Sequence, residues 1–433
     1  MKWFYVILVF LLVSSFEASA GKYDGFSKAQ VCQEKCHDMI YGEWKDSVHA
    51  NAYRDPFYQR MARLASRETG GKSDKYCIRC HAPVASLAGL VPPVDGRNMT
   101  DVAKEGITCD FCHTVTGFQG HEPGNGLYLS TPGNTKYAPL KDSETKNHKC
   151  AESKLHSSSR FCGMCHQLEH YETGTLLIST FLEWEDAVEA AEDEAEDTGK
   201  KPVILQCQQC HMSKGVNKFE PRIGQSAQLA PIRPHVGVHR FDGANVFLHN
   251  LLDLKVDHEK RKQRLSEAAR LELVDIGRSG ATGLAFSVKV TNVGAGHKLP
   301  TGMLESRHIW LEVTVTDAGG ETFYRSGQLD GDYRLAPDTR MFRAVLGDKN
   351  GNPTLKIWEA AQKLSDTRLI PWKPKIEKFQ VKNLPGGVPL KIRVALNYRP
   401  TYQEQADLVF KGNERKIVPV VTMTEIVKEV PGV

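Results

Sequence analysis

Polar and apolar residues alternate along several short segments in the last third of the chain, as in strands that bury one face. The segments are 284–290, 308–316, 322–326, 376–381, 390–396 and 417–427. Turn sequences such as Ala-Gly-Gly and Pro-Gly-Gly separate them. The pattern predicts an antiparallel β-sandwich domain over residues 276–433, with an immunoglobulin-like arrangement as one option.

Residues 21–258 show little alternation, and they predict a mainly helical, loop-rich domain. An acidic helix is expected over residues 181–197, either as a solvated face or as a docking surface for a basic partner. A charged helix over residues 259–275 is expected to link the two domains. The predicted fold class is therefore α+β, with the helical domain first and the β-sandwich domain second.

The first twenty residues have the features of a signal peptide. Lys2 precedes an apolar run over residues 3–13, and Ala18-Ser19-Ala20 is a small-residue cleavage site. The alternative is an uncleaved membrane anchor, but the run is short for a membrane span. We therefore predict a periplasmic or extracellular protein, and no later apolar stretch predicts a transmembrane segment in the mature chain.

Ten of the eleven cysteines form five close pairs, and a histidine follows each pair directly. The pairs and their histidines are Cys32, Cys36 and His37; Cys77, Cys80 and His81; Cys109, Cys112 and His113; Cys162, Cys165 and His166; and Cys207, Cys210 and His211. Four are Cys-x-x-Cys-His motifs, which attach haem covalently. The first motif has one extra residue between its cysteines.

This spacing suits haem c for a chemical reason. Two thiols three positions apart lie on one side of a helical turn, where both can form thioethers to one haem. The next histidine can then ligate the iron from below. Zinc sites or disulfides would not require a histidine after every pair. The sequence thus predicts five covalently attached haem c groups, each with its iron.

Low-spin electron-transfer haems usually take a second axial ligand, and eleven of the sixteen histidines lie outside the motifs. We predict that His49, His148 and His239 are such ligands. His297 is a further candidate because it lies in a Gly- and Pro-rich loop between two predicted strands. The fifth position is open among His235, His170, His121, His156 and His249, with His235 as the first choice. His258 and His308 are expected to be structural.

The remaining cysteine, Cys150, has three open roles: a buried thiol, an intermolecular link or an iron ligand. The formal charge of +4 gives no argument for nucleic-acid binding. Haem carboxylates and ferric centres would bring the loaded chain close to neutral. We therefore expect redox proteins as electron donor and acceptor, and no nucleic acid as partner.

Several of these motifs, with their flanking residues, resemble the tetrahaem cytochrome c family that accepts electrons from hydroxylamine oxidation. The matching segments are Cys36-His37 with Trp44 and Ser47-Val-His49-Ala, Cys77-Ile-Arg-Cys-His-Ala-Pro83, Gly106-Ile-Thr-Cys-Asp-Phe-Cys-His113, Cys162-Gly-Met-Cys-His166, Glu183-Trp184 and Cys207-Gln-Gln-Cys-His-Met212. The resemblance covers most of residues 30–245. It implies closely packed, mostly bis-histidine haems, with His49, His148 and His239 as distal ligands. The fifth motif, the acidic helix and the β-domain depart from that family's pattern.

Three functions remain open from the sequence. The first is an electron carrier with five haems. The second is an oxidoreductase that acts on a small nitrogen or sulfur compound at one haem with an open position. The third is a subunit of a cytochrome filament or of a membrane-associated respiratory complex, assembled through the β-domain. The family contains both carriers and reductases, so the resemblance does not separate the first two.

Overall fold

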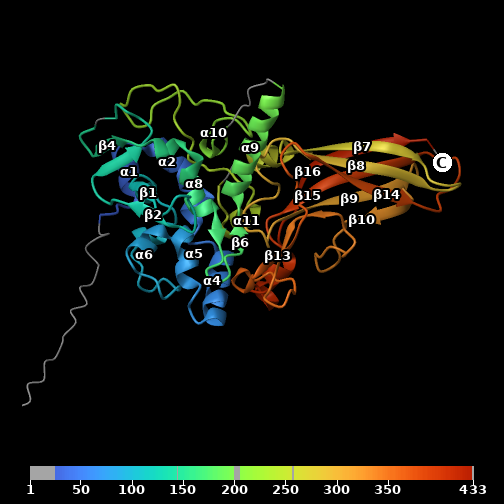
Figure 1. Cartoon of the computed structure of the whole chain (residues 1–433), viewed down its shortest axis with the longest axis horizontal. Coiled ribbons are helices and arrows are strands. Elements are labelled where there is room, and N and C mark those ends of the chain that lie inside the picture. Colours follow the sequence, from blue (N-terminus) through green and yellow to red (C-terminus); the bar gives the residue numbers. More distant parts are fainter. Residues whose placement is uncertain (1–24, 144, 199–204, 256–257, 432–433) are drawn as a thin grey trace, which may run out of the picture.

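The computed structural model describes residues 25–143, 145–198, 205–255 and 258–431, so the predicted signal peptide lies outside the described residues. The fold is mixed α+β. Most helices gather at one end of the molecule and the longest strands at the other (Figure 1). Within the described ranges, no helix is both long enough and apolar enough to cross a membrane.

Most helices are short and alternate with loops. The α-helices are α1 (Ala29–Lys35), α2 (Asp38–Trp44), α3 (Val48–Asn51), α4 (Pro56–Thr69), α5 (Asp74–His81), α6 (Pro83–Leu87), α7 (Cys109–Cys112), α8 (Ser159–His166), α9 (Thr180–Thr198), α10 (Cys207–His211), α11 (Val246–Leu252), α12 (His258–Ser266) and α13 (Gln403–Asp407). Turns of 3-10 helix span η2 (Val102–Lys104), η3 (Lys154–Ser157), η4 (Ile357–Glu359) and η5 (Gly412–Glu414).

Helix α4 shows how local sequence sets these boundaries. The Asp55 side chain accepts a hydrogen bond from the backbone N–H of Phe57, and Pro56 occupies the first turn. Gly70 ends the helix with φ of 60°, a left-handed conformation that glycine adopts without steric cost. Helix α9 agrees with the predicted helix over residues 181–197. Its Asp186, Glu189 and Glu192 are exposed, as expected for a solvated acidic face.

Short strand pairs brace the loops among the helices. They are β1 (Val115–Phe118) with β2 (Tyr128–Ser130), β3 (Thr135–Ala138) with β4 (Lys149–Glu152), and β5 (Leu168–Glu169) with β6 (Leu176–Ile178). The β3–β4 pair is parallel, and the other two are antiparallel.

The longer strands form two main antiparallel sheets. One has the order β14-β8-β7, and the other has the order β10-β9-β15-β16 with β11 beside β9. A separate pair joins β12 to β13. These strands are β7 (Ala269–Arg278), β8 (Leu284–Asn292), β9 (His308–Asp317), β10 (Thr322–Ser326), β11 (Met341–Phe342), β12 (Ala344–Gly347), β13 (Gln362–Asp366), β14 (Pro374–Val381), β15 (Leu390–Arg399) and β16 (Val421–Val430).

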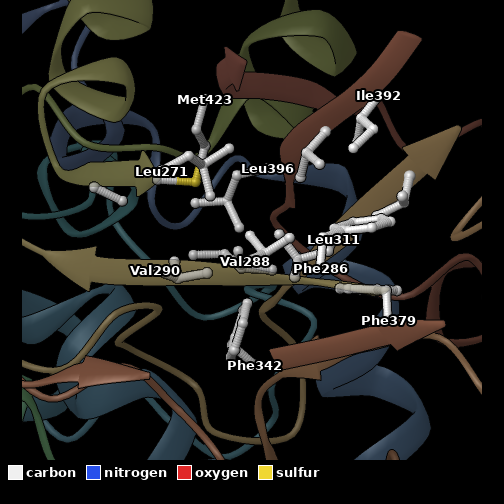
Figure 2. Close-up of a cluster of buried hydrophobic side chains, with 14 of the residues drawn as sticks. Leu271, Phe286, Val288, Val290, Leu311, Phe342, Phe379, Ile392, Leu396 and Met423 are labelled. Carbon is white, nitrogen blue, oxygen red and sulfur yellow. The ribbon is translucent and has the colours of Figure 1, made fainter. Parts of the chain in front are cut away.

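Side chains from both sheets share one hydrophobic core (Figure 2). Val288 and Val290 of β8 are fully buried, as are Leu311 of β9 and Leu396 of β15. Alternate residues of β8, β9 and β15 enter this core, so the period-2 pattern of these segments is the direct consequence of one-sided burial. All six segments predicted as strands contain strands of the structure.

The predicted linking helix over residues 259–275 is wrong in its second half. Helix α12 ends at Ser266, and strand β7 begins at Ala269 and pairs with β8. Leu271 and Leu273 recur two positions apart, and Leu271 enters the shared core while Arg270 is exposed. The charged residues around them, Arg270, Glu272 and Asp275, favoured a helix by composition, but pairing with β8 and apolar burial decide the structure.

The helical part is in direct contact with segments that connect the strands. The Trp358 indole Nε1 donates a hydrogen bond of 2.8 Å to the Glu68 carboxylate at the end of α4. The ring of Phe57 in α4 also lies 6.4 Å from that of Phe410, between β15 and β16, measured between centroids. This contact places loops of the β region at the wall of the site described next.

Candidate haem-binding site

One large cavity connects all five motifs. Its volume is about 2100 Å³, and its wall includes all ten motif cysteines and all five motif histidines. Ordinary small-molecule pockets reach about 1000 Å³. The cavity therefore has room for several large groups, and it brings together cysteines that are up to 178 positions apart in the sequence.

Each motif begins a helix or lies on one. Four motifs lie on α5, α7, α8 and α10, so their two thiols are three positions apart on one helical turn. In the first motif, Cys32 lies on α1 and Cys36 is its C-cap residue. The backbone N–H groups of Cys36 and His37 both donate to the Cys32 carbonyl, at 3.3 Å and 3.0 Å. The extra residue is thus absorbed at the end of the helix.

Backbone carbonyls orient four of the motif histidines through Nδ1. The Nδ1 atoms of His37, His81, His113 and His211 lie 2.8, 2.9, 2.8 and 3.3 Å from the carbonyl oxygens of Ser226, Ala52, Tyr137 and Asp242. Donation from Nδ1–H leaves Nε2 with its lone pair, which is the tautomer that binds a metal. The structure therefore prepares these rings as ligands.

Four histidines outside the motifs lie near motif histidines in the cavity wall; one of them, His156, has its ring centroid 5.9 Å from that of His113. The other three form separate pairs. The ring centroids are 6.4 Å apart for His37 and His148, 6.4 Å for His113 and His239, and 6.3 Å for His49 and His166. Two imidazoles that ligate one metal from opposite sides, with metal–nitrogen bonds of about 2.0 Å, have centroids about 6 Å apart. The measured separations fit one iron between each pair.

Burial favours the neutral form, which ligation requires, for three of these rings. Burial lowers the pKa of His49 and His239 to about 3, and that of His166 to about 4. The Nδ1 atom of His239 lies 2.9 Å from the Gly237 carbonyl, so its Nε2 is the free nitrogen. A neutral imidazole with an unprotonated Nε2 is the ligand form.

His297 lies in the cavity wall, on the loop between β8 and β9. Burial lowers its pKa, and its Nδ1 lies 2.9 Å from the Lys298 carbonyl. Burial likewise lowers the pKa of His211 to about 3, with smaller contributions from the charges of Arg264 and His297. His297 is thus an electrostatic neighbour of His211.

A buried ion-pair network holds the His297 loop against helix α9. Glu183 of α9 pairs with Arg368, and both side chains are 3% exposed. Arg368 also makes a two-pronged contact with Asp366, with Nε–Oδ1 and Nη2–Oδ2 distances of 2.9 Å each. The Thr301 hydroxyl donates a hydrogen bond of 2.6 Å to Glu183. Since Thr301 belongs to the His297 loop, the network sets the position of that loop.

Within the described part of the chain, no histidine ring faces His81. The ring that lies against His81 is that of Tyr58. The two rings are parallel within 3°, with centroids 3.7 Å apart. The Tyr58 hydroxyl is buried and has no hydrogen-bond partner among the described residues. The motif at Cys77 therefore differs from the three motifs that have an opposing histidine.

His235 reaches the cavity wall, but its nitrogen is used differently. Its Nδ1 accepts a hydrogen bond of 3.1 Å from the backbone N–H of Arg222, and its ring lies edge-on to Phe219. A neutral imidazole that accepts at Nδ1 carries its proton on Nε2 and is not a ligand in that form. The prediction that His235 is the fifth distal ligand gains no support from this geometry.

Two of the other candidates for the fifth position, His156 and His170, are also held by hydrogen bonds. His156 has Nε2 2.9 Å from the Cys112 carbonyl and Nδ1 2.9 Å from the Ser153 hydroxyl. His170 Nε2 lies 3.1 Å from the Trp358 carbonyl, and its Nδ1 accepts from two backbone N–H groups. His308 is fully buried and stacks on Tyr402 at 3.9 Å, consistent with a structural role.

Sequence reasoning did not identify three features of the site. It missed Tyr58 beside His81, the Glu183–Arg368 network, and Arg307 in the cavity wall as a functional side chain. Glu183 belongs to the segment Glu183-Trp184 that resembles the tetrahaem family, which is weak evidence for a role. Arg307 lies at the end of the Gly- and Pro-rich loop that contains His297. Nothing in the local sequence around Arg368 indicates its role, because its partner is 185 positions away.

The comparisons with known proteins agree with this site. Residues 31–114 match the family model described as cytochrome c554 and c-prime. A penta-heme cytochrome c552 from Thermochromatium tepidum has a similar structure, with a TM-score of 0.64 and 20% sequence identity over 94% of this chain and 98% of that chain. A structural-genomics target matches with a TM-score of only 0.17 and carries no argument. No curated protein matches the sequence.

The likeness to the cytochrome c552 extends over nearly the whole chain, so it covers both the helical part and the sheets. At this level of identity the likeness shows the fold. The match over residues 31–114 supports a c-type cytochrome with covalently bound haem c. The side chains fit that group, because thiols and neutral imidazoles converge on one cavity of sufficient volume.

Proposed function

We propose that this chain is an exported electron-transfer protein with five covalently attached haems. The observation that carries the proposal is the set of three opposed histidine pairs, with centroids 6.3–6.4 Å apart, beside attachment motifs in one cavity. Bis-histidine ligation favours electron transfer without substrate binding, because it leaves no open position on the iron. The cysteines supply thioether bonds, and the histidines tune the reduction potentials.

The haems at the second and fifth motifs, those of His81 and His211, have no opposed histidine among these three pairs. His297 is an electrostatic neighbour of both His166 and His211. We assign it as the partner of His211, because His166 already faces His49. The β region would then be a sandwich domain that donates a ligand to a haem of the helical domain. This arrangement would explain why the loop is anchored to helix α9.

Thiols of different motifs suggest an electron route that does not follow the sequence order. Three pairs of thiols from different motifs are near enough to shift each other's pKa: Cys32 with Cys109, Cys80 with Cys165, and Cys162 with Cys207. Haems attached at these thiols would be neighbours. The fourth motif would then join the second and fifth, and the first would join the third.

A specific observation favours a second candidate function, an oxidoreductase acting on a small nitrogen or sulfur compound. Among the described residues, no histidine ring opposes His81 in the way that His148 opposes His37. A haem at the Cys77 motif would then have an open position. The two candidates differ in one measurable property, since an open ferric haem is high-spin and a bis-histidine haem is low-spin.

Haem counting and spectroscopy on the purified protein test the proposal. A pyridine haemochrome assay should give five haems per chain, and four after the double change Cys32→Ser and Cys36→Ser. The Cys150→Ser variant is the matched control and should keep five. A count of four in the unchanged protein would refute the role of the first motif. An EPR spectrum with only low-spin signals would support a carrier, and a high-spin signal lost on nitrite addition would support the oxidoreductase.

A further inference from the structure

A group of three polar side chains stands in the cavity wall where strands β9 and β15 meet the helical part. Arg307 lies just before β9, Tyr398 lies near the end of β15, and Glu305 lies in the loop before Arg307. Tyr398 is 2% exposed and Glu305 is 3% exposed. They are remote in sequence from every cysteine motif, so haem attachment does not account for them.

These side chains have unused hydrogen-bonding capacity. The Tyr398 hydroxyl and the Glu305 Oε2 atom are buried without a hydrogen-bond partner in the described part of the chain. Across the same ranges, Arg307 forms no ion pair, and one of its N–H groups donates to the Thr301 carbonyl. Buried polar groups are rarely left unpaired in native proteins, so a partner for Tyr398 and Glu305 is expected beside the half-buried Arg307.

The fold makes room for the Arg307 guanidinium. Gly302 has φ of 99°, and a Cβ atom at that position would lie 2.0 Å from Arg307 Nη1. Only glycine therefore allows the guanidinium to occupy this place. The other oxygen of Glu305 is already satisfied, because it accepts from the Ser306 hydroxyl at 3.0 Å and from Gln405 Nε2 at 3.3 Å.

The charge of Arg307 acts on the cavity. Burial lowers the pKa of His166, and the Arg307 charge lowers it further. Burial raises the pKa of Tyr398, and the Arg307 charge offsets part of that rise. Burial raises the pKa of Glu305 to about 7, so this carboxyl is available as a neutral O–H donor near pH 7. Guanidinium, phenol and protonated carboxyl are all hydrogen-bond donors. A donor set that includes a cation binds an oxyanion.

We propose that Arg307, Tyr398 and Glu305 form an oxyanion-binding site in the wall of the haem cavity. The ligand is an oxyanion group from one of two sources: a propionate of an attached haem, or a free small anion such as nitrite or sulfite. The assignment rests on the proposed multihaem function. It goes beyond that function because it gives the β region a recognition role in addition to the His297 ligand.

The test uses the full-length, haem-loaded protein and three variants: Arg307→Gln, Tyr398→Phe and the control Arg393→Gln. Arg393 belongs to β15 but is paired with Glu312 and Glu425 and lies outside the cavity wall. Sodium nitrite and sodium sulfite are titrated into the oxidised protein and followed by visible spectra and calorimetry. Potentials are measured by spectroelectrochemistry, and the haem count of each variant is checked first.

Binding of nitrite or sulfite to the unchanged protein, weakened at least tenfold by Arg307→Gln and less by Tyr398→Phe, supports a free oxyanion. If neither salt binds to the unchanged protein, but Arg307→Gln and Tyr398→Phe each lower the reduction potential of one haem, the result supports a propionate. Tyr398→Phe removes no charge, so its shift reports a lost hydrogen bond to an anion. If neither salt binds and Tyr398→Phe leaves all potentials at the control value, the site is refuted. Five haems in every variant would separate that result from a failure of the proposed function.

Discussion

The Glu183–Arg368 pair gives the sharpest prediction about how the two parts of the molecule are joined. The change Arg368→Met removes the cation but keeps a long apolar side chain. Glu183, which is 3% exposed, would lose its countercharge, and among the described residues only the Ser179 and Thr301 hydroxyls, at 2.6 Å each, would still donate to it. Removal of one partner of a buried ion pair costs about 3–5 kcal/mol. Because two donors remain, we expect about 3 kcal/mol.

The assay is urea unfolding of the haem-loaded protein, followed by circular dichroism and by the Soret band. Arg393→Met is the matched control, because it also breaks ion pairs of a β-region arginine but that side chain is 36% exposed. Exposed pairs contribute about 0–1 kcal/mol, so the control should lose no more than that. If His297 is an iron ligand, Arg368→Met should also raise the high-spin fraction in the EPR spectrum.

A double variant checks the physical reason for the loss. Glu183→Gln together with Arg368→Met removes both charges, so it should recover much of the stability that Arg368→Met loses. The reasoning is refuted if Arg368→Met costs no more than Arg393→Met. It is also refuted if the double variant is as unstable as the sum of the two single variants, because the loss would then not come from an unpaired buried charge.

The other predictions concern single side chains. Burial raises the pKa of Glu305 from 4.5 to about 7, so the folded state binds the proton more tightly, and stability should fall by about 3 kcal/mol as pH rises from 4.5 through 7. Glu305→Gln should remove that part of the dependence in urea unfolding at pH 5 and pH 8, and an unchanged difference would contradict the burial argument. His239→Ala should convert one haem to high spin in the EPR spectrum, whereas His235→Ala should leave the spin state unchanged; a high-spin signal from the second variant would restore it as a ligand. Gly302→Ala should cost about 2 kcal/mol or more by thermal or urea unfolding, and Gly174→Ala, also at positive φ but with open space around it, should cost less.

Local spacing predicted the attachment sites because each site is local. Two cysteines and a histidine within six residues occupy one helical turn wherever that helix lies, and all five sets line the cavity. Alternation likewise predicted the strands, because it results from one-sided burial. The helix predicted between residues 267 and 275 is wrong, because the charged residues there outweighed the period-2 pattern of Leu271 and Leu273. There the pairing with β8, a contact between strands, decided the structure.

The sequence by itself therefore determined the class of cofactor, the number of attachment motifs and the succession of a helical part and a β part. It also supplied a set of candidate ligands that includes His49, His148 and His239. Only the tertiary structure decided which histidine faces which motif, that Tyr58 lies against His81, and that Arg368 is held against Glu183. The reason is physical: a thioether motif depends on bonds within one helical turn, whereas an opposed pair of imidazoles or a buried ion pair depends on distances between segments that only the folded chain sets.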